Sequence, residues 1–172
     1  MPDIAAVNGL ERDAFVALLG GVFEHAAWVA EAAWLDRPFV GVSDLHAAMM
    51  GAVRAAPPDR RLAFLNGHPE LAGPEARAKS MTVESVSEQG AAGLDRMPQE
   101  DADTFDQLNP AYRQKFGFPF IVAVRGRDRS EILALFKARL LRSQDEEASV
   151  VLDEIAAITR MRLDRLVSEA SS

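Results

Sequence analysis

The chain has 172 residues, of which 48% are hydrophobic and 26% are charged, a balance typical of one globular domain rather than of a disordered protein. Its formal net charge is −7 at pH 7, which argues against a nucleic-acid or anionic-membrane surface, because either needs a basic stripe. No cysteine is present, so a disulfide framework, a thiol nucleophile and a zinc–thiolate site are excluded.

The chain also lacks recognisable targeting signals. Its first residues, MPDIAAVNGLERD, have no basic segment followed by an apolar stretch, and SEASS is not a peroxisomal signal. No run approaches the roughly 18 apolar residues that a membrane helix needs. We therefore expect a cytoplasmic protein that binds neither nucleic acid nor a membrane.

Helices are predicted along the whole chain, separated by turns that contain proline or glycine. Residues 10–34 carry apolar side chains at helical spacing, with Gly20-Gly21 as the expected break. Ser43 or Asp44 is placed to cap the next helix, which runs to about residue 55. The remaining helices are expected at 59–65, 83–96, 100–115, 128–141 and 145–168.

One residue is expected to cap a helix and another to interrupt one, and a further segment departs from the helical pattern. Thr82 is a candidate N-cap for 83–96, whereas Pro110 is expected to kink or divide 100–115. The run FIVAVRG at 120–126 resembles a strand, but it is short and has no evident partner, so we expect an extended segment. The sequence predicts an all-α, single-domain helical bundle over residues 1–172 with this extended segment.

His68 is one of three histidines and stands between Gly67 and Pro69. Because proline disfavours the α conformation in the preceding residue, His68 is expected at a helix end or in a loop. If Pro69 begins a helical turn, the free amides of that turn would lower the pKa of His68 and favour the neutral base. A solvent-exposed loop histidine is the simpler interpretation.

Polar side chains are clustered on one face of the helix expected at 83–96. Ser85, Glu88 and Gln89 stand at i, i+3 and i+4, and Ala92 and Gly93 lie one turn further along the same face. Small residues beside clustered polar ones suit a pocket wall or a close helix contact. An ordinary solvated face is the alternative.

The last predicted helix carries an arginine within its apolar stripe. Arg162 falls near the middle of that stripe, and a buried guanidinium must be paired. Its partner is either an internal carboxylate or an anionic substrate, for which arginine offers a bidentate fork. The stripe consists of Val151, Leu152, Ile155, Ile158, Leu163 and Leu166.

The other two histidines, His25 and His46, are 21 residues apart, and neither has a second metal ligand at i, i+4. We therefore expect no metal site, and structural roles for both histidines.

Taken in order along the chain, several motifs resemble those of the OHCU decarboxylases, which convert 2-oxo-4-hydroxy-4-carboxy-5-ureidoimidazoline (OHCU) to (S)-allantoin in urate degradation. The sequence departs from the family pattern at Ala26-Ala27, where Ser-Pro is usual, so substrate fit there is in question. The matching motifs are Phe23-Glu24-His25, Trp28-Val29-Ala30, Arg37-Pro38-Phe39, His68-Pro69-Glu70-Leu71-Ala72-Gly73, Ser85-x-x-Glu88-Gln89-x-x-Ala92-Gly93-Leu94, Leu108-Asn109-x-Ala111-Tyr112-x-x-Lys115-Phe116-Gly117-Phe118-Pro119-Phe120, Val124-Arg125-Gly126 and Arg160-Met161-Arg162-Leu163.

The resemblance implies an all-helical carboxy-lyase that needs no cofactor and is commonly a homodimer. It implies that His68 and Glu88 are catalytic, and that Arg162 holds the substrate. It also implies substrate contacts for Pro69, Ser85, Gln89, Phe120, Ile121 and Val122, the last three through unpaired backbone groups.

Two other functions remain compatible with the residues. A non-catalytic helical module that binds a partner protein would explain the helices and the acidic surface. A decarboxylase of a related ureido or imidazoline acid would keep the fold, and Ala26-Ala27 is the feature that supports it.

Overall fold

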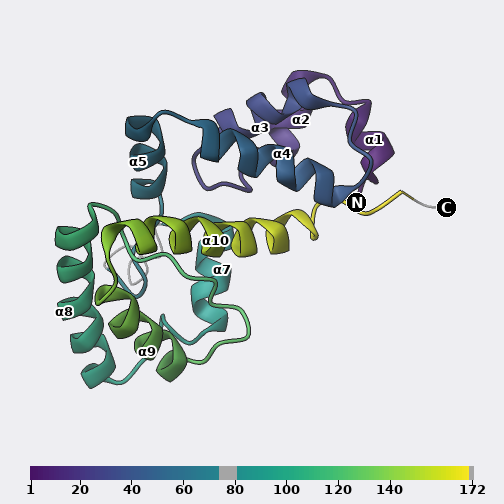
Figure 1. Cartoon of the computed structure of the whole chain (residues 1–172). Coiled ribbons are helices and arrows are strands. Elements are labelled where there is room, and N and C mark those ends of the chain that lie inside the picture. The colour runs from purple at the N-terminus through teal and green to yellow at the C-terminus, as the bar shows by residue number, and fades with distance from the viewer. Residues whose placement is uncertain (74–80, 171–172) are drawn as a thin grey trace. The chain divides into compact units, whose positions relative to one another are not determined.

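The computed structural model describes residues 1–73 and 81–170, and its regular secondary structure there is helical (Figure 1). One isolated bridge pairs Asp3 with Ser168. This confirms the all-α prediction. Among these described residues, no helix is both long and apolar enough to cross a membrane. The chain folds into two compact units, one of residues 1–67 and 156–172 and the other of residues 68–155.

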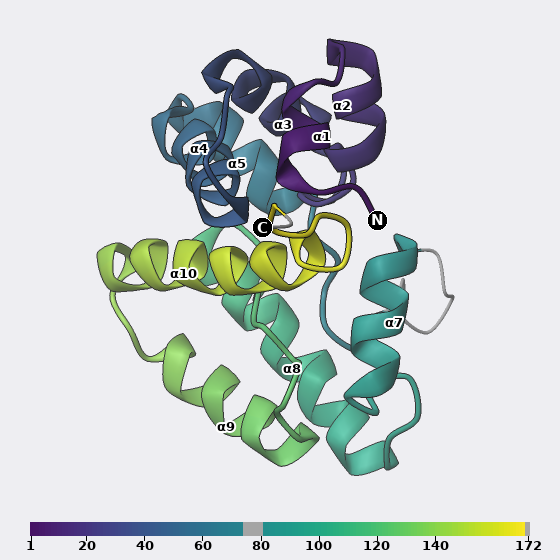
Figure 2. The same ribbon diagram turned by 90° about the vertical axis from the view of Figure 1, so that its right-hand side faces the viewer.

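The first unit is built from short helices, and α3 contacts both α2 and α4 (Figure 2). Its core is fully buried and apolar, with Phe15, Leu19, Val29, Leu45 and Met49 at 0% exposure. The elements of the unit are α1 (Ile4–Asn8), α2 (Arg12–Leu19), α3 (Ala27–Ala33), the 3₁₀ turn η1 (Trp34–Asp36), α4 (Val42–Ala55) and α5 (Pro58–Asn66).

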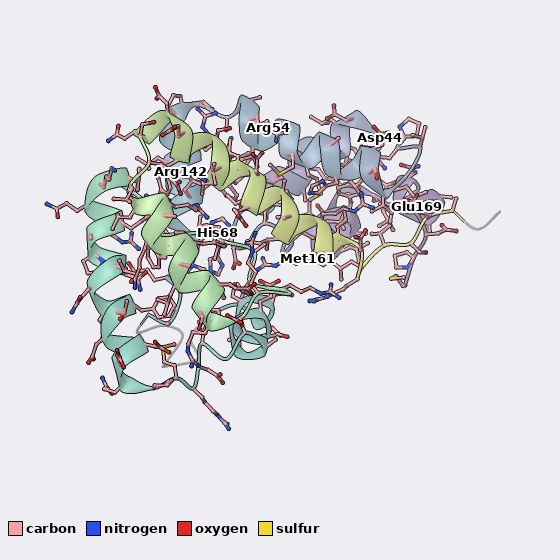
Figure 3. The ribbon with its side chains drawn as sticks, turned by 60° about the horizontal axis from the view of Figure 1, so that its bottom comes forward. Asp44, Arg54, His68, Arg142, Met161 and Glu169 are labelled. Atoms are coloured by element: carbon pink, nitrogen blue, oxygen red, sulfur yellow. The ribbon has the colours of Figure 1, made fainter. Side chains whose placement is uncertain are left out.

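The predicted break at Gly20-Gly21 is confirmed, because α2 ends at Leu19. The predicted cap of α4 is wrong: Gly41 is the N-cap, and Ser43 and Asp44 lie inside the helix. Glu169 takes the capping role from far along the chain, since its carboxylate oxygens accept from the Val42 amide at 3.2 and 3.3 Å. Figure 3 labels Glu169 and Asp44 at this end of α4.

The second unit contains α7 (Val83–Ala91), α8 (Gln99–Phe116) and α9 (Arg129–Leu140), with α8 and α9 side by side (Figure 1). The last helix, α10 (Gln144–Leu163), begins in this unit and ends in the first one. The core of the second unit is aromatic: Tyr112 packs against the rings of Phe116, Phe118, Phe120 and Phe136 at centroid distances of 4.5–5.9 Å.

Three predicted helix boundaries need correction. α7 ends at Ala91, well before 96, because Gly93 adopts a φ of +72° and turns the chain so that Leu94 becomes buried. α8 runs through Pro110 as one helix, with that proline on its exposed side. α10 ends at Leu163, well before 168, because the Ser168 backbone pairs instead with Pro2 and Ile4.

Candidate active site

His68 follows directly after α5, where Gly67 caps the helix. Its conformation is non-helical, as the following proline predicts, and no helix begins at Pro69. The side chain is only 8% exposed, so the interpretation as an exposed loop histidine is wrong. The side chains in Figure 3 include His68, labelled in the interior of the drawing.

The segment after His68 is held by side chains from two helices. Gln89 on α7 accepts from the Ala72 amide at 3.0 Å and donates to the Glu70 carbonyl at 3.3 Å. Asn109 on α8 donates to the Leu71 carbonyl at 3.0 Å. These three bonds fix successive peptide groups of residues 70–72 and thereby restrict the chain that carries His68.

Two backbone features show how tightly this segment is folded. Ala72 has a φ of +51°, which is unfavourable for a residue with a side chain, and it is 1% exposed. A Cβ atom at Gly73 would stand 2.9 Å from the Cβ of Glu70, so only glycine fits there. In addition, Arg113 on α8 donates to the Glu70 carboxylate at 3.0 Å. The structure therefore gives a physical reason for the residue types in this motif.

α7 presents the predicted polar face of the site. Thr82 is its N-cap and accepts from the Ser85 amide at 3.3 Å, as predicted. Ser85 and Gln89 are each 4% exposed, whereas Glu88 is half-buried. The alternative of an ordinary solvated face is therefore wrong for this helix.

The structure brings Gln89 into contact with the segment that follows His68 and Pro69, and it shows an interaction that the sequence did not indicate. The Gln89 amide also donates to the sulfur of Met81 at 3.2 Å, so this side chain is largely engaged by the protein itself. Direct interaction of His68 with Glu88 stays a prediction, as do the substrate contacts of Pro69, Ser85 and Gln89.

The extended segment predicted at 120–126 is confirmed up to residue 124, where the chain forms neither helix nor strand, whereas Arg125 and Gly126 form a turn. Phe120, Ile121 and Val122 are 1–4% exposed. Side chains rather than a neighbouring strand hold the backbone, since the Ile121 carbonyl accepts from Arg139 at 2.7 Å and the Ala123 amide donates to Glu154 at 2.8 Å. The expectation that the backbone groups of Phe120, Ile121 and Val122 are all unpaired is thus too broad, because the Ile121 carbonyl already accepts a hydrogen bond from Arg139.

A buried charged cluster lies beside this segment, and sequence reasoning missed it. Arg139 pairs with Glu147 at 2.5 Å, and their side chains are 1% and 0% exposed. The Tyr112 hydroxyl donates to the same carboxylate oxygen, and burial followed by this bond raises the pKa of Tyr112. Arg139 lies in a helix with little amphipathic pattern, and an arginine among apolar neighbours was the one available signal.

Arg162 is 4% exposed and belongs to the first unit, whereas the other predicted site residues belong to the second. It donates to Glu24 at 2.8 Å and to the Val22 carbonyl at 3.3 Å. An internal carboxylate is therefore one partner of this arginine, and it is one of the two partners that the sequence suggested. Its contact with a substrate stays a prediction.

A pocket of about 180 Å³ lies within the first unit and includes the place where the sequence departs from the family pattern. Glu24, His25 and Ala26 form part of its wall, and Gly67, the residue before His68, forms another part. Arg60 and Trp28 also line this pocket, and the Arg60 guanidinium lies over the Trp28 ring, 4.2 Å from its centroid.

The predicted site residues offer an imidazole, a carboxylate and amide groups, a set suited to proton transfer and to binding a polar ring. Within the described part of the chain, no group of three or more His, Asp or Glu side chains is arranged to hold a metal ion.

Comparison with known proteins agrees with the motifs. The chain matches the family model for OHCU decarboxylase over residues 8–164. It is 39% identical over 164 residues to the 2-oxo-4-hydroxy-4-carboxy-5-ureidoimidazoline decarboxylase of Haloferax volcanii, and the match covers 95% of both proteins. It is also 37% identical over 163 residues to the uric acid degradation bifunctional protein PucL of Bacillus subtilis, covering 95% of this chain and 32% of that protein.

A crystal structure of (S)-allantoin synthase superimposes with a TM-score of 0.77 at 27% identity. The superposition covers 98% of this chain and 54% of the other, so this chain spans about half the length of that protein. Since both the family model and a relative of nearly equal length match along almost the whole sequence, the chain belongs to the OHCU decarboxylase family.

Proposed function

We propose that this chain catalyses the decarboxylation of OHCU to (S)-allantoin, a carbon–carbon lyase reaction in the degradation of urate. Family membership supports the reaction class, and the Haloferax volcanii relative carries the name of this decarboxylase. The observation that carries the proposal for the site is the buried His68, followed by a segment bonded to the helix of Ser85, Glu88 and Gln89.

The reaction can proceed on the electron sink that the substrate itself supplies. When the bond to the carboxylate breaks and CO2 leaves, the electron pair forms a C=C bond to the neighbouring ring carbon, and the ring C=N nitrogen takes up a proton. Loss of the hydroxyl proton and protonation of the neighbouring carbon then give the carbonyl of allantoin. The net change is loss of CO2 and gain of one proton, so no external oxidant or reductant is needed.

His68 and Glu88 are proposed as the acid–base pair. The imidazole takes the hydroxyl proton, or stabilises the charge there as the C–C bond breaks. Glu88 accepts a hydrogen bond from the substrate hydroxyl or from His68 and fixes its orientation. Each such group typically contributes about 10²–10⁴-fold to the rate.

The other predicted residues are proposed to bind and orient the ring. Ser85 and Gln89 supply polar contacts, and Pro69 forms a wall. The backbone of Phe120, Ile121 and Val122 reads the ring and ureido amides, and Arg162 holds an anionic or carbonyl group. Protonation from a single face then sets the S configuration.

The test is OHCU turnover by purified variants, followed by optical activity because OHCU also decays spontaneously to racemic allantoin. His68→Ala and Glu88→Ala should each lower the rate by about 10²–10⁴-fold while the far-UV circular dichroism stays unchanged. His46→Gln and Glu84→Ala are matched controls, since they change a histidine and a glutamate outside the proposed site and should keep full turnover. Near wild-type turnover by either Ala variant of the pair would disprove its role.

Three further properties are part of the proposal: the enzyme works without a metal or organic cofactor, forms a homodimer and acts in the cytoplasm. The electron sink within the substrate supports the first. The family resemblance supports the second. Dialysis against a chelator should leave turnover unchanged, and sedimentation equilibrium should give twice the chain mass.

A further inference from the structure

The second unit contains an ion pair buried away from water. Arg139 is 1% exposed and Glu147 is 0% exposed. The Arg139 Nε and Nη2 groups both donate to Oε1 of Glu147, at 2.8 and 2.5 Å. Oε2 of Glu147 is buried and has no hydrogen-bond partner among the described residues. Taking two charges out of water is costly, and apolar residues of similar size often give equal or higher stability. Stability alone therefore accounts poorly for this pair.

The guanidinium also holds the extended segment. Its Nη1 group donates to the Ile121 carbonyl at 2.7 Å, and its plane lies over the Phe120 ring at 4.5 Å. On that ring, Phe136 stacks at a centroid distance of 3.9 Å and an angle of 7°. One rigid side chain, fixed in turn by Glu147, thus sets both the carbonyl direction of Ile121 and the ring position of Phe120.

The next residues show what this fixation leaves available. Glu154 accepts from the Ala123 amide at 2.8 Å, and Arg127 donates to the Ala123 carbonyl at 2.8 Å. Between the two fixed residues, the N–H and C=O of Val122 take no hydrogen bond within the described part of the chain, although Val122 is 3% exposed. Buried backbone groups of this kind are normally paired. The arrangement keeps a donor and an acceptor oriented for an amide-like partner.

We propose that Arg139 is a positioning residue, which holds Phe120–Val122 in the geometry that binds the amide edges of the substrate. This inference rests on the proposed function, because it assumes that this backbone meets the substrate. Glu147 supplies the charge that keeps the guanidinium in place, and the Tyr112 hydroxyl donates a further hydrogen bond to the same carboxylate oxygen, Oε1. Neither Arg139 nor Glu147 takes part in the proton transfers.

Two variants test the role of Arg139 without leaving a buried charge alone. Arg139→Lys keeps the positive charge beside Glu147 but lacks the planar fork that serves Ile121 at the same time. The triple variant Tyr112→Phe/Arg139→Met/Glu147→Leu removes every polar group of the cluster, a kind of replacement that proteins tolerate. In each folded variant, KM for OHCU should rise about 3- to 10-fold, as expected for one lost hydrogen bond, with kcat within about twofold of wild type. The inhibition constant of (S)-allantoin should rise in parallel.

The matched control is Asp101→Leu/Arg129→Met, which removes another arginine–carboxylate pair between α8 and α9 at 2.5 Å but touches none of residues 120–122. Its KM should equal that of the wild type. A wild-type KM in either Arg139 variant with an intact circular dichroism spectrum would overturn the inference, as would an equal rise in the control. Failure of the proposed function would look different, because the wild-type chain itself would then not produce (S)-allantoin.

Discussion

At the scale of single residues, Glu24 combines an unfavourable backbone with a buried charge. Its φ is +53°, in the left-handed region that residues with side chains rarely adopt, and it is 5% exposed. The strain is held by the bond of 2.8 Å between its carboxylate and Arg162. Interactions with the surrounding fold must therefore offset the unfavourable energy of this backbone conformation, as commonly happens near functional sites.

Removal of the Glu24 carboxylate is expected to be severe. Glu24→Ala leaves the Arg162 guanidinium buried without that carboxylate, and such a loss typically costs about 3–5 kcal/mol of unfolding free energy. Urea denaturation measures the change. Glu31→Ala removes the carboxylate of an exposed pair with Arg12 and should cost less than about 1 kcal/mol. Similar losses in the two variants would contradict this account of Glu24.

His46 gives the molecule a pH-dependent contribution to stability. Burial chiefly lowers its pKa, and the charges of Arg160 and Arg54 act in the same direction, while Asp164 opposes them. The ring hydrogen-bonds to the Thr159 hydroxyl at 2.9 Å. The unfolded chain therefore binds a proton more readily than the folded one, so the contribution is present above about pH 6.5 and is lost as the pH falls through the lower folded value.

His46→Gln should remove this dependence. The unfolding free energy of the wild type should fall more steeply than that of the variant as the pH is lowered from about 7 to about 5.5, above the range where most carboxylates titrate. Urea denaturation at a series of pH values gives the two curves. Parallel curves would show that His46 does not carry the effect.

The predictability of the site differs from residue to residue. The non-helical conformation of His68 follows from Pro69 alone, because the steric effect of proline is local. Burial of Ser85 and Gln89 follows from their shared helix face together with the small residues next to it. The bonds from Gln89 to residues 70–72 were not predictable, because they depend on how a loop packs on a helix distant in sequence.

At the scale of helices, the start of α9 is fixed by its own side chains. Asp128 accepts from the Glu131 amide at 2.9 Å, and Glu131 accepts from the Asp128 amide at 2.8 Å, which completes a capping box. This box follows the extended segment closely, and α9 carries Arg139. The cap therefore helps to fix the helix on which the proposed positioning residue stands.

Asp128→Ala should lower the unfolding free energy by about 0.5–2 kcal/mol, the usual range for loss of a helix N-cap. Asp153→Ala is the comparison, since Asp153 is exposed in the middle of α10 and should change stability by less than about 0.5 kcal/mol. Urea denaturation of both variants decides the matter. Equal effects would mean that the loss comes from charge and not from capping.

Helix interiors were predicted well and helix ends less well, for reasons that individual elements show. The apolar stripe of α10 is confirmed in part, since Val151, Ile155 and Leu163 are fully buried. Leu152 is half-buried, and Leu166 lies beyond the end of the helix. Its end at Leu163 was not predictable, because the residues beyond it are drawn into backbone pairing with the N-terminus. The cap of α4 by Glu169 was likewise hidden, because 127 positions separate its donor and acceptor.

At the scale of the whole molecule, α10 takes part in both compact units. Its first part contributes Glu147, Val151 and Ile155 to the second unit, and its last part contributes Thr159 and Arg162 to the first. Helix formation is cooperative, so melting one part of α10 removes hydrogen bonds that support the other part. The single-domain prediction for residues 1–172 therefore implies that the two units unfold together.

Tryptophan fluorescence offers a test of this coupling, because Trp28 and Trp34 both lie in the first unit whereas far-UV circular dichroism reports the helices of both. Urea denaturation followed by the two probes should give coincident curves with one midpoint, as two-state unfolding requires. Ala156→Gly, a substitution at the boundary within α10, should shift both curves together by about 1 kcal/mol. Separate midpoints for the two probes would show that the units fold independently, and a variant that shifts only one probe would locate the break within α10.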